Sequence, residues 1–280
     1  MKHFKKILAT LLTFALLCSL SMPAFAADSA PIPEETVGDE LFDDLIWLTD
    51  NPLEDFSPDT KEWLEWFNSL PEEVQLTINY RPSELLNLKD IDPADLVEVQ
   101  QHDGDGSGES VGIVPYNQPL MATGGGELSY SPSTWEPYTE YTNCYNYAIN
   151  YYYNSGDPLQ PGELARKPYT SLSKSDIFAA AKADMPYLGK TIRASSYSEV
   201  PGENEYKVAL VIAPNKDYHW YRQDSDGRWS HKRGITAITN LDASDDKIYD
   251  PQTADRDYRF LFIFGPNYST FCGYYIINYG

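Results

Sequence analysis

Residues 218–232 read YHWYRQDSDGRWSHK, and this stretch decides the fold class. Runs rich in tyrosine and tryptophan flank the turn residues 225–227, a pattern that is typical of a β-hairpin. A three-residue loop suits this turn, because Gly227 stands at the loop position that needs a positive φ. That loop pairs Tyr221 with His231. We therefore expect His219 and His231 on the same face of the sheet.

Apolar runs around the hairpin predict further strands at residues 206–213, 261–264 and 274–277. Two helices are expected earlier in the chain. One begins at Cys144, capped by Thr142 or Asn143, and runs through the tyrosines 151–153 to a stop at Asn154. The other covers residues 173–183. Helices followed by an antiparallel sheet predict an α+β domain over residues 128–280.

The segment before this domain differs from it in charge. Residues 27–110 hold 23 acidic residues and three basic ones. Apolar residues recur at helical spacing in 37–50 and 59–70, so we expect residues 27–100 to form an acidic helical module. Residues 101–127 are rich in glycine and proline and are expected to be a linker. The module has no catalytic set of its own. It could dock on the second domain as a propeptide or lid, or bind an outside basic partner.

The first 26 residues have the three parts of a signal peptide: a basic start, an apolar stretch and the small-residue exit Ala24-Phe25-Ala26. They predict a secreted protein whose mature chain begins near Ala27. The whole chain carries a net charge of −21, and the leader holds three lysines and no acidic residue, so the mature charge is −24. Such a charge argues against nucleic acid and anionic membrane as partners, because both are polyanions.

Cys144 is the residue that points to chemistry. A thiol at a helix start is close to unpaired N–H groups and the helix dipole, which lower its pKa and favour the nucleophilic thiolate. An imidazole beside it would complete an activated nucleophile. His219 and His231 flank one hairpin and are the candidates for that imidazole.

A helix that begins with cysteine, followed by an antiparallel sheet with histidine on one strand and a second polar residue on the next, resembles papain-like cysteine hydrolases. Within residues 140–235 it is similar to NlpC-type cell-wall endopeptidases and CHAP amidases. The resemblance implies Cys144 as nucleophile, His219 as general base and acid, and His231 as the group that orients His219. It implies hydrolysis of a peptide or amide bond, with the Cys144 N–H as one oxyanion donor. A peptide or cell-wall substrate is the partner that follows.

Several alternatives stay open. Asn240 or Asp250 could orient His219 in place of His231. Cys144 and Cys272, the two cysteines left after maturation, could form a disulfide, which would remove the nucleophile. The protein would then be a non-enzymatic secreted binding protein, with its aromatic-rich sheet binding carbohydrate or protein.

No cofactor or metal is expected. His102 to Glu109 has calcium-loop residues without the spacing of an EF-hand, and a flexible linker is the preferred interpretation. Asp242 to Asp250 holds four aspartates in a short loop, which is interpreted as a solvated acidic loop.

Overall fold

The computed structural model describes residues 56–86, 88, 91–100, 120–154, 157–261 and 263–280. All described residues belong to one compact unit. The signal peptide and the helix expected at 37–50 lie outside the described residues. Among the helices of the described part, none combines the length and the apolar character that crossing a membrane requires.

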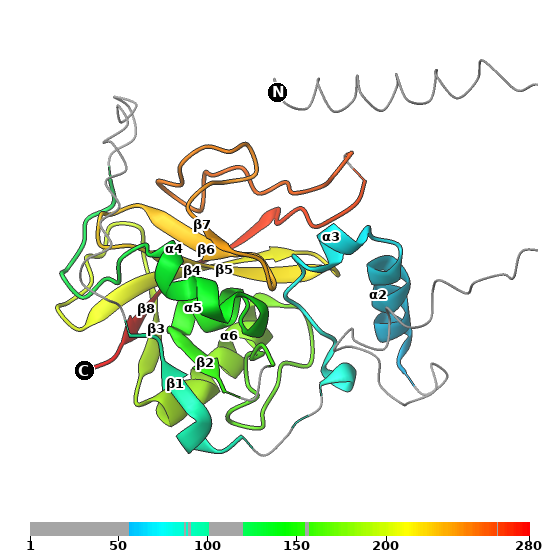
Figure 1. The fold of residues 1–280 in the computed structure, drawn as a ribbon, viewed down its shortest axis with the longest axis horizontal. Helices are drawn as coiled ribbons and strands as arrows, with labels where there is room; N and C mark the ends of the chain where they lie inside the picture. The colour runs from blue at the N-terminus through cyan, green and yellow to red at the C-terminus, as the bar shows by residue number, and fades with distance from the viewer. Residues whose placement is uncertain (1–55, 87, 89–90, 101–119, 155–156, 262) are drawn as a thin grey trace, which may run out of the picture. The chain divides into compact units, whose positions relative to one another are not determined.

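A six-stranded antiparallel sheet forms the centre of this unit (Figure 1). Its strand order is β3-β8-β4-β5-β6-β7. The strands are β3 (Thr191–Ser195), β4 (Glu205–Ala213), β5 (Asp217–Gln223), β6 (Trp229–Lys232), β7 (Ile238–Thr239) and β8 (Thr270–Asn278). A separate antiparallel pair joins β1 (Leu96–Glu98) to β2 (Tyr151–Tyr153). Together with the helices, this arrangement confirms the α+β class.

The helices and helical turns are mostly short. They are α2 (Pro58–Asn68), α3 (Glu72–Gln75), η2 (Ser83–Leu85), η3 (Pro93–Asp95), α4 (Pro132–Trp135), η4 (Glu136–Tyr141), α5 (Cys144–Ile149), α6 (Lys174–Asp184) and η5 (Met185–Leu188). The N-cap of α5 is Asn143, whose side chain accepts from the backbone N–H groups of Tyr145 and Asn146. This capping box begins the helix at Cys144, as the sequence predicts.

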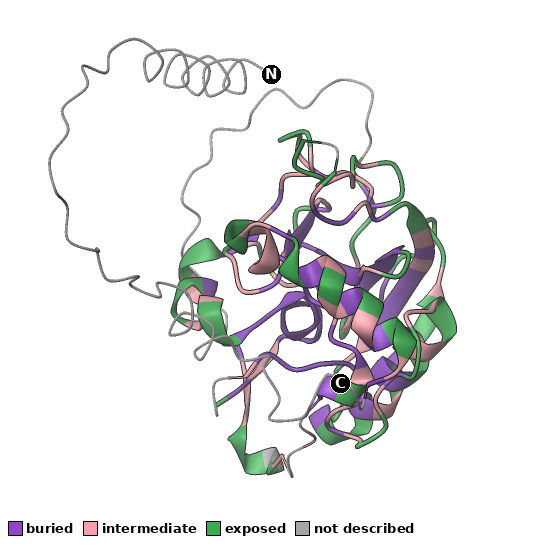
Figure 2. Cartoon of the chain, turned by 90° about the vertical axis from the view of Figure 1, so that its right-hand side faces the viewer, coloured by how far each residue is buried: buried purple, intermediate pink, exposed green. Residues whose placement is uncertain are grey.

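The sheet has an apolar cluster on each face. On one face, Tyr218 and Trp220 of β5 pack with residues of α5 and α6. On the other face, Tyr221 of β5 packs with Trp229, Ile248 and Tyr268. The long connection between β7 and β8 therefore covers the face that is turned away from α5 (Figure 1). Figure 2 shows the buried residues gathered along the strands.

The hairpin has the expected register. Tyr221 lies opposite His231, and the N–H of Asp224 donates to the carbonyl of Arg228 at 2.9 Å. Gly227 has φ +81°, the left-handed conformation that a three-residue loop needs at its last position. Ser225, Asp226 and Gly227 thus set which side chains of β5 and β6 share a face.

Two expected elements are wrong. The helix that begins at Cys144 ends at Ile149, because Asn150 adopts φ 61°, and the tyrosines that follow form β2. Residues 261–264 are not a strand of the sheet. Leu261 has φ 52°, and the chain turns back so that the N–H of Phe264 donates to the carbonyl of Phe260 at 3.0 Å.

The described part of the N-terminal segment packs against the sheet domain. Trp63 and Phe67 of α2 belong to an apolar cluster that also includes Ile78 and Leu85, and Phe264 packs against it. The indole N–H of Trp63 donates to the carbonyl of Lys216 at 2.8 Å, which ties α2 to the turn between β4 and β5. The described residues of the module expected at 27–100 belong to the same compact unit as residues 128–280. The linker expected between them falls largely on residues that the structure does not describe.

Candidate functional site

His219 and His231 meet on the covered face of the sheet. Successive side chains of a strand point to opposite faces, so His219 lies on the same side as Tyr221 and away from Trp220. Its ring packs against Tyr221 and Tyr268, with centroids 5.0 and 5.3 Å away. His219 Nε2 lies 2.8 Å from His231 Nδ1. The structure thus brings together the two histidines that the hairpin register predicts to be neighbours.

The hydrogen bonds fix the tautomer of each ring. His231 Nε2 lies 2.9 Å from the carbonyl of Leu241, which can only accept, so this nitrogen carries the proton. His231 Nδ1 is then an acceptor, and His219 Nε2 must donate to it. His219 Nδ1 is left as an acceptor and faces the amide Nδ2 of Asn79 at 3.2 Å. Both rings are neutral, and both nitrogens of each ring are engaged.

Asn79 extends this network to the start of α5. Its Oδ1 accepts from the backbone N–H of Cys144 at 3.2 Å and from that of Gly234 at 3.0 Å. Its Nδ2 donates to Asp217 at 3.1 Å as well as to His219. The Cys144 N–H, which the hydrolase resemblance implies as an oxyanion donor, is therefore already hydrogen-bonded within the protein.

Asp217 is the carboxylate of the network. It accepts from the backbone N–H groups of Asn79, Tyr80 and Tyr218 and from the hydroxyl of Tyr268, which lies 2.6 Å away. Complete burial raises its pKa to about 7, while the hydrogen bonds from Tyr268 and Asn79 act in the opposite direction. Burial also lowers the pKa of His231 to about 3, and it lowers the pKa of His219 well below its usual value.

Cys144 lies on the other face of the sheet. It packs with Tyr218 and Trp220, on the side of α5 and α6. The pKa of its thiol is raised well above the ordinary value, first by burial and then by the negative charge of Asp217. A buried thiol of raised pKa stays protonated at neutral pH, and His219 has no free nitrogen to remove its proton. The helix start therefore does not produce a thiolate here.

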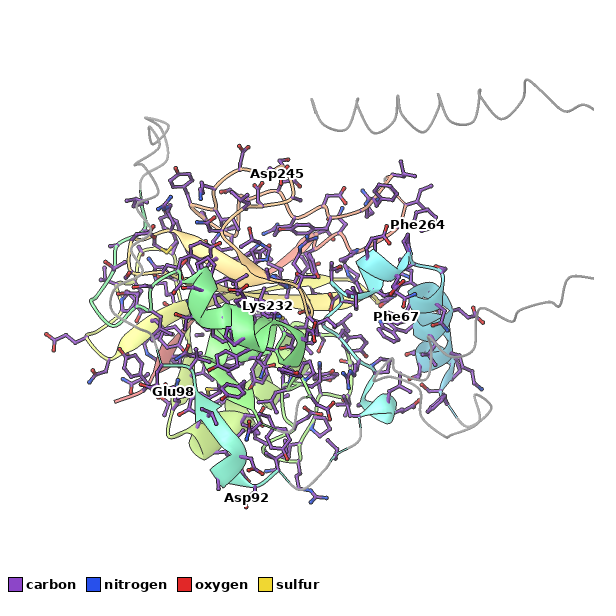
Figure 3. All side chains as sticks on the ribbon, viewed as in Figure 1. Phe67, Asp92, Glu98, Lys232, Asp245 and Phe264 are labelled. Carbon is purple, nitrogen blue, oxygen red and sulfur yellow. The ribbon has the colours of Figure 1, made fainter. Side chains whose placement is uncertain are left out.

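Lys232 is a cation whose charge lowers the pKa of the Cys144 thiol, although burial outweighs this effect. Its ammonium donates to the carbonyls of Thr139, Thr142 and Gly234, at 2.7, 2.5 and 2.9 Å. Burial lowers its pKa to about 7, and Cys144 acts against that shift. Lys232 is fully buried, and Figure 3 labels it near the middle of the view. Through Thr139 and Thr142, Lys232 connects β6 with the segment that leads into α5.

The three residues of the proposed triad are buried. Cys144, His219 and His231 each have a relative exposure of 0%. Two cavities of the described unit, one beside α2 and one beside α6, are lined by none of these three residues. In the part of the chain that the structure describes, the thiol and the two imidazoles are thus fully buried.

Among the described residues, neither Asn240 nor Asp250 is a hydrogen-bond partner of His219, whose two nitrogens face Asn79 and His231. Asn240 accepts from the ammonium of Lys247 at 2.9 Å, and Asp250 accepts from the hydroxyl of Tyr274. Cys144 and Cys272 are both free, so they do not form a disulfide. Among the described residues, no group of three or more His, Cys, Asp or Glu side chains could hold a metal ion. Asp242 instead accepts from the backbone N–H groups of its own loop.

Sequence reasoning missed Asn79 and Asp217. Asp217 carries one signal: it stands two residues before His219 in the same strand and therefore shares its face. Asn79 has no such signal, because it comes from the segment that we expected to be a separate module.

Comparison with known proteins gives one informative match. The chain is 38% identical over 148 residues to the insoluble matrix shell protein 1 of Ruditapes philippinarum, an alignment that covers 52% of this chain and 86% of that protein. No family model matches the chain. No solved structure matches it either.

The match and the geometry together correct one prediction and confirm another. The cysteine hydrolase is wrong, and so is the thiol-protease class: the relative is a shell matrix protein, and Cys144 and His219 do not form an activated pair. The secreted localisation is confirmed, because a shell matrix is extracellular. The hairpin aromatics Trp220, Tyr221 and Trp229 are buried and form core, so they do not present a ligand-binding face.

Proposed function

Because this chain belongs to the family of the insoluble matrix shell protein 1, we propose that it is a non-enzymatic structural component of an extracellular matrix. One observation carries the proposal: the residues that could have formed a thiol active site are divided between the two faces of the sheet and are closed off by hydrogen bonds within the protein. The alternative of a non-enzymatic secreted protein is the better supported of the two sequence-based hypotheses.

The same network has a structural role that suits this function. Asn79, His219 and His231 link the N-terminal segment, β5, β6 and the connection that follows β7 through buried hydrogen bonds. Buried polar groups that are fully satisfied specify a single arrangement and are costly to break. A component that persists in a matrix benefits from such a closed core.

We also propose that the sheet domain is a papain-like scaffold without peptidase activity. The support is a cysteine at the first residue of α5 and the packing of that helix on an antiparallel sheet. This proposal concerns the fold alone.

Fractionation of the secreted material of the source cells tests the function. We expect the protein in the insoluble extracellular fraction, and we expect Cys144→Ala to be retained there as well as wild type, with Cys272→Ala as the matched control for loss of a buried thiol. The reason is that retention depends on the folded surface and not on a nucleophile. Recovery of wild type in the soluble fraction alone, or a peptide-cleaving activity that is lost only in Cys144→Ala, contradicts the proposal.

A further inference from the structure

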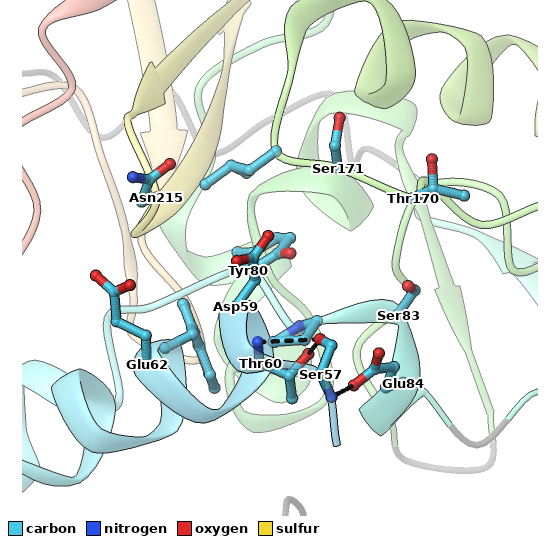
Figure 4. Close-up of a pocket in the computed structure, with 13 residues that line it drawn as sticks. Ser57, Asp59, Thr60, Glu62, Tyr80, Ser83, Glu84, Thr170, Ser171 and Asn215 are labelled. Carbon is cyan, nitrogen blue, oxygen red and sulfur yellow. Dashed lines mark hydrogen bonds between the residues drawn. The ribbon is translucent and has the colours of Figure 1, made fainter. Parts of the chain in front are cut away.

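A cavity of about 320 Å³ lies between α2, η2, the loop before α6 and the turn between β4 and β5 (Figure 4). It is distinct from the histidine network. Its lining includes the carboxylates of Asp59, Glu62 and Glu84. Most of its other side chains bear a hydroxyl or amide group, and among the described residues that line it there is no lysine, arginine or histidine. The cavity is therefore polar and negatively charged.

The three carboxylates do not form a metal site. Among the described residues, no hydrogen bond or ion pair within 4 Å joins Asp59 or Glu62 to a partner, although the charge of Glu62 acts on the neighbouring Lys216 and raises its pKa against the effect of burial. Glu84 accepts from the backbone N–H of Ser57 at 3.0 Å. They are not grouped closely enough to hold one metal ion. Since Ca²⁺ needs six to eight oxygens at about 2.3–2.6 Å, a larger cation suits this spacing better.

Aromatic rings form the inner wall of the cavity. Trp63 and Tyr80 both line it, and their ring centroids lie 5.8 Å apart in an edge-to-face arrangement. The pKa of Tyr80 is raised to about 12, first by burial and then by the charges of Asp59 and Glu84. A ligand with an apolar stem and a cationic end fits both features.

The neighbouring Lys216 shows the same kind of contact, a cationic side chain over an aromatic ring, within the protein. Its ammonium lies 4.7 Å from the ring centroid of Trp66, which belongs to the same helix as Asp59 and Glu62. One cationic side chain is thus already seated against α2.

We propose that this cavity binds the side chain of a lysine or arginine from a basic polypeptide partner. The alkyl stem packs against the ring of Tyr80, and the charged end is paired by Asp59 and Glu62 at the mouth. The mature chain, whose net charge is −24 once the three lysines of the leader are removed, attracts such a partner over a longer range. This inference concerns one contact of the molecule and holds whether or not the protein enters a matrix.

Fluorescence anisotropy with the purified mature protein tests it. The probe is a labelled decapeptide of alternating lysine and glycine. We expect saturable binding that is weakened about tenfold by Asp59→Asn/Glu62→Gln, because the paired charges are lost. The control is Glu140→Gln/Glu203→Gln, which removes the same charge at two exposed residues outside the cavity and leaves binding within about twofold.

A second pair of variants keeps the test decisive. Glu62→Lys places an ammonium at the mouth of the cavity and is expected to abolish binding, whereas Glu140→Lys is expected to preserve it. Equal weakening by the cavity variants and their controls means attraction by net charge alone and overturns the proposal. Equal binding of a peptide with glutamine in place of lysine overturns it too.

Discussion

Each nitrogen of His219 has a partner, and this decides what the residue can do. Nε2 donates to His231 and Nδ1 accepts from Asn79, so no lone pair faces a thiol. Asn79 donates to His219, His219 donates to His231, and His231 donates to the backbone carbonyl of Leu241. Removing any member leaves buried groups without a partner, which costs more than the bond itself contributes.

Asn79→Ala tests the centre of this chain of hydrogen bonds. The substitution leaves the N–H groups of Cys144 and Gly234 and the Nδ1 of His219 without their partner. We expect the free energy of unfolding to fall by about 3–5 kcal/mol, measured by urea denaturation. Asn68→Ala, at an exposed residue of α2, is the control and is expected to change it by less than about 1 kcal/mol. A similar small loss in both variants would show that the network contributes little.

The pH dependence of stability follows from the low pKa of His231. Burial lowers it from 6.5 to about 3, so the folded protein resists protonation that the unfolded chain accepts. The stabilisation is complete above about pH 6.5 and is lost as the pH falls towards 3. His231→Gln removes this dependence, so we expect the stability difference between wild type and variant to shrink by about 2 kcal/mol between pH 6.5 and pH 5. Parallel curves in urea denaturation at the two pH values would contradict it.

At the scale of elements, the β5–β6 hairpin shows what the sequence can determine. Ser225, Asp226 and Gly227 fix the loop, and the loop fixes the register that brings His219 to His231. The apolar run at 261–264 has strand composition, but it turns back on itself at Leu261. Apolar composition alone therefore does not distinguish a strand from an apolar turn.

Gly227→Ala tests the hairpin loop. Gly227 has φ +81°, and an added Cβ would lie 2.7 Å from the carbonyl oxygen of Met121. Gly189 also has a positive φ, +66°, but its Cβ would meet nothing within 4 Å. We expect Gly189→Ala to cost about 1 kcal/mol and Gly227→Ala about 2–3 kcal/mol, measured as unfolding free energies. Equal losses of unfolding free energy in the two variants would mean that the contact with Met121 does not affect stability.

For the whole molecule, the sequence predicts the α+β class and secretion but not the way the parts close on one another. Asn79 lies 140 residues before His219, and their contact depends on how the N-terminal segment packs on the sheet. The sequence pattern placed a cysteine at a helix start and a histidine on a nearby strand. The pattern did not reveal that Cys144 and His219 lie on opposite faces of the sheet. Their placement depends on which face of β5 the helix α5 packs against.

The reactivity of the Cys144 thiol in the native protein tests the central claim, that Cys144, His219 and His231 belong to a closed structural core. The native mature protein is treated with a small alkylating agent from about pH 5 to about pH 9, and the label is located by mass spectrometry. We expect Cys144 to stay unlabelled across this range and to react fully after unfolding, because it is buried and its pKa is raised. Fast labelling of Cys144 in the native protein, lost in His219→Ala, would mean an activated nucleophile and would contradict the account.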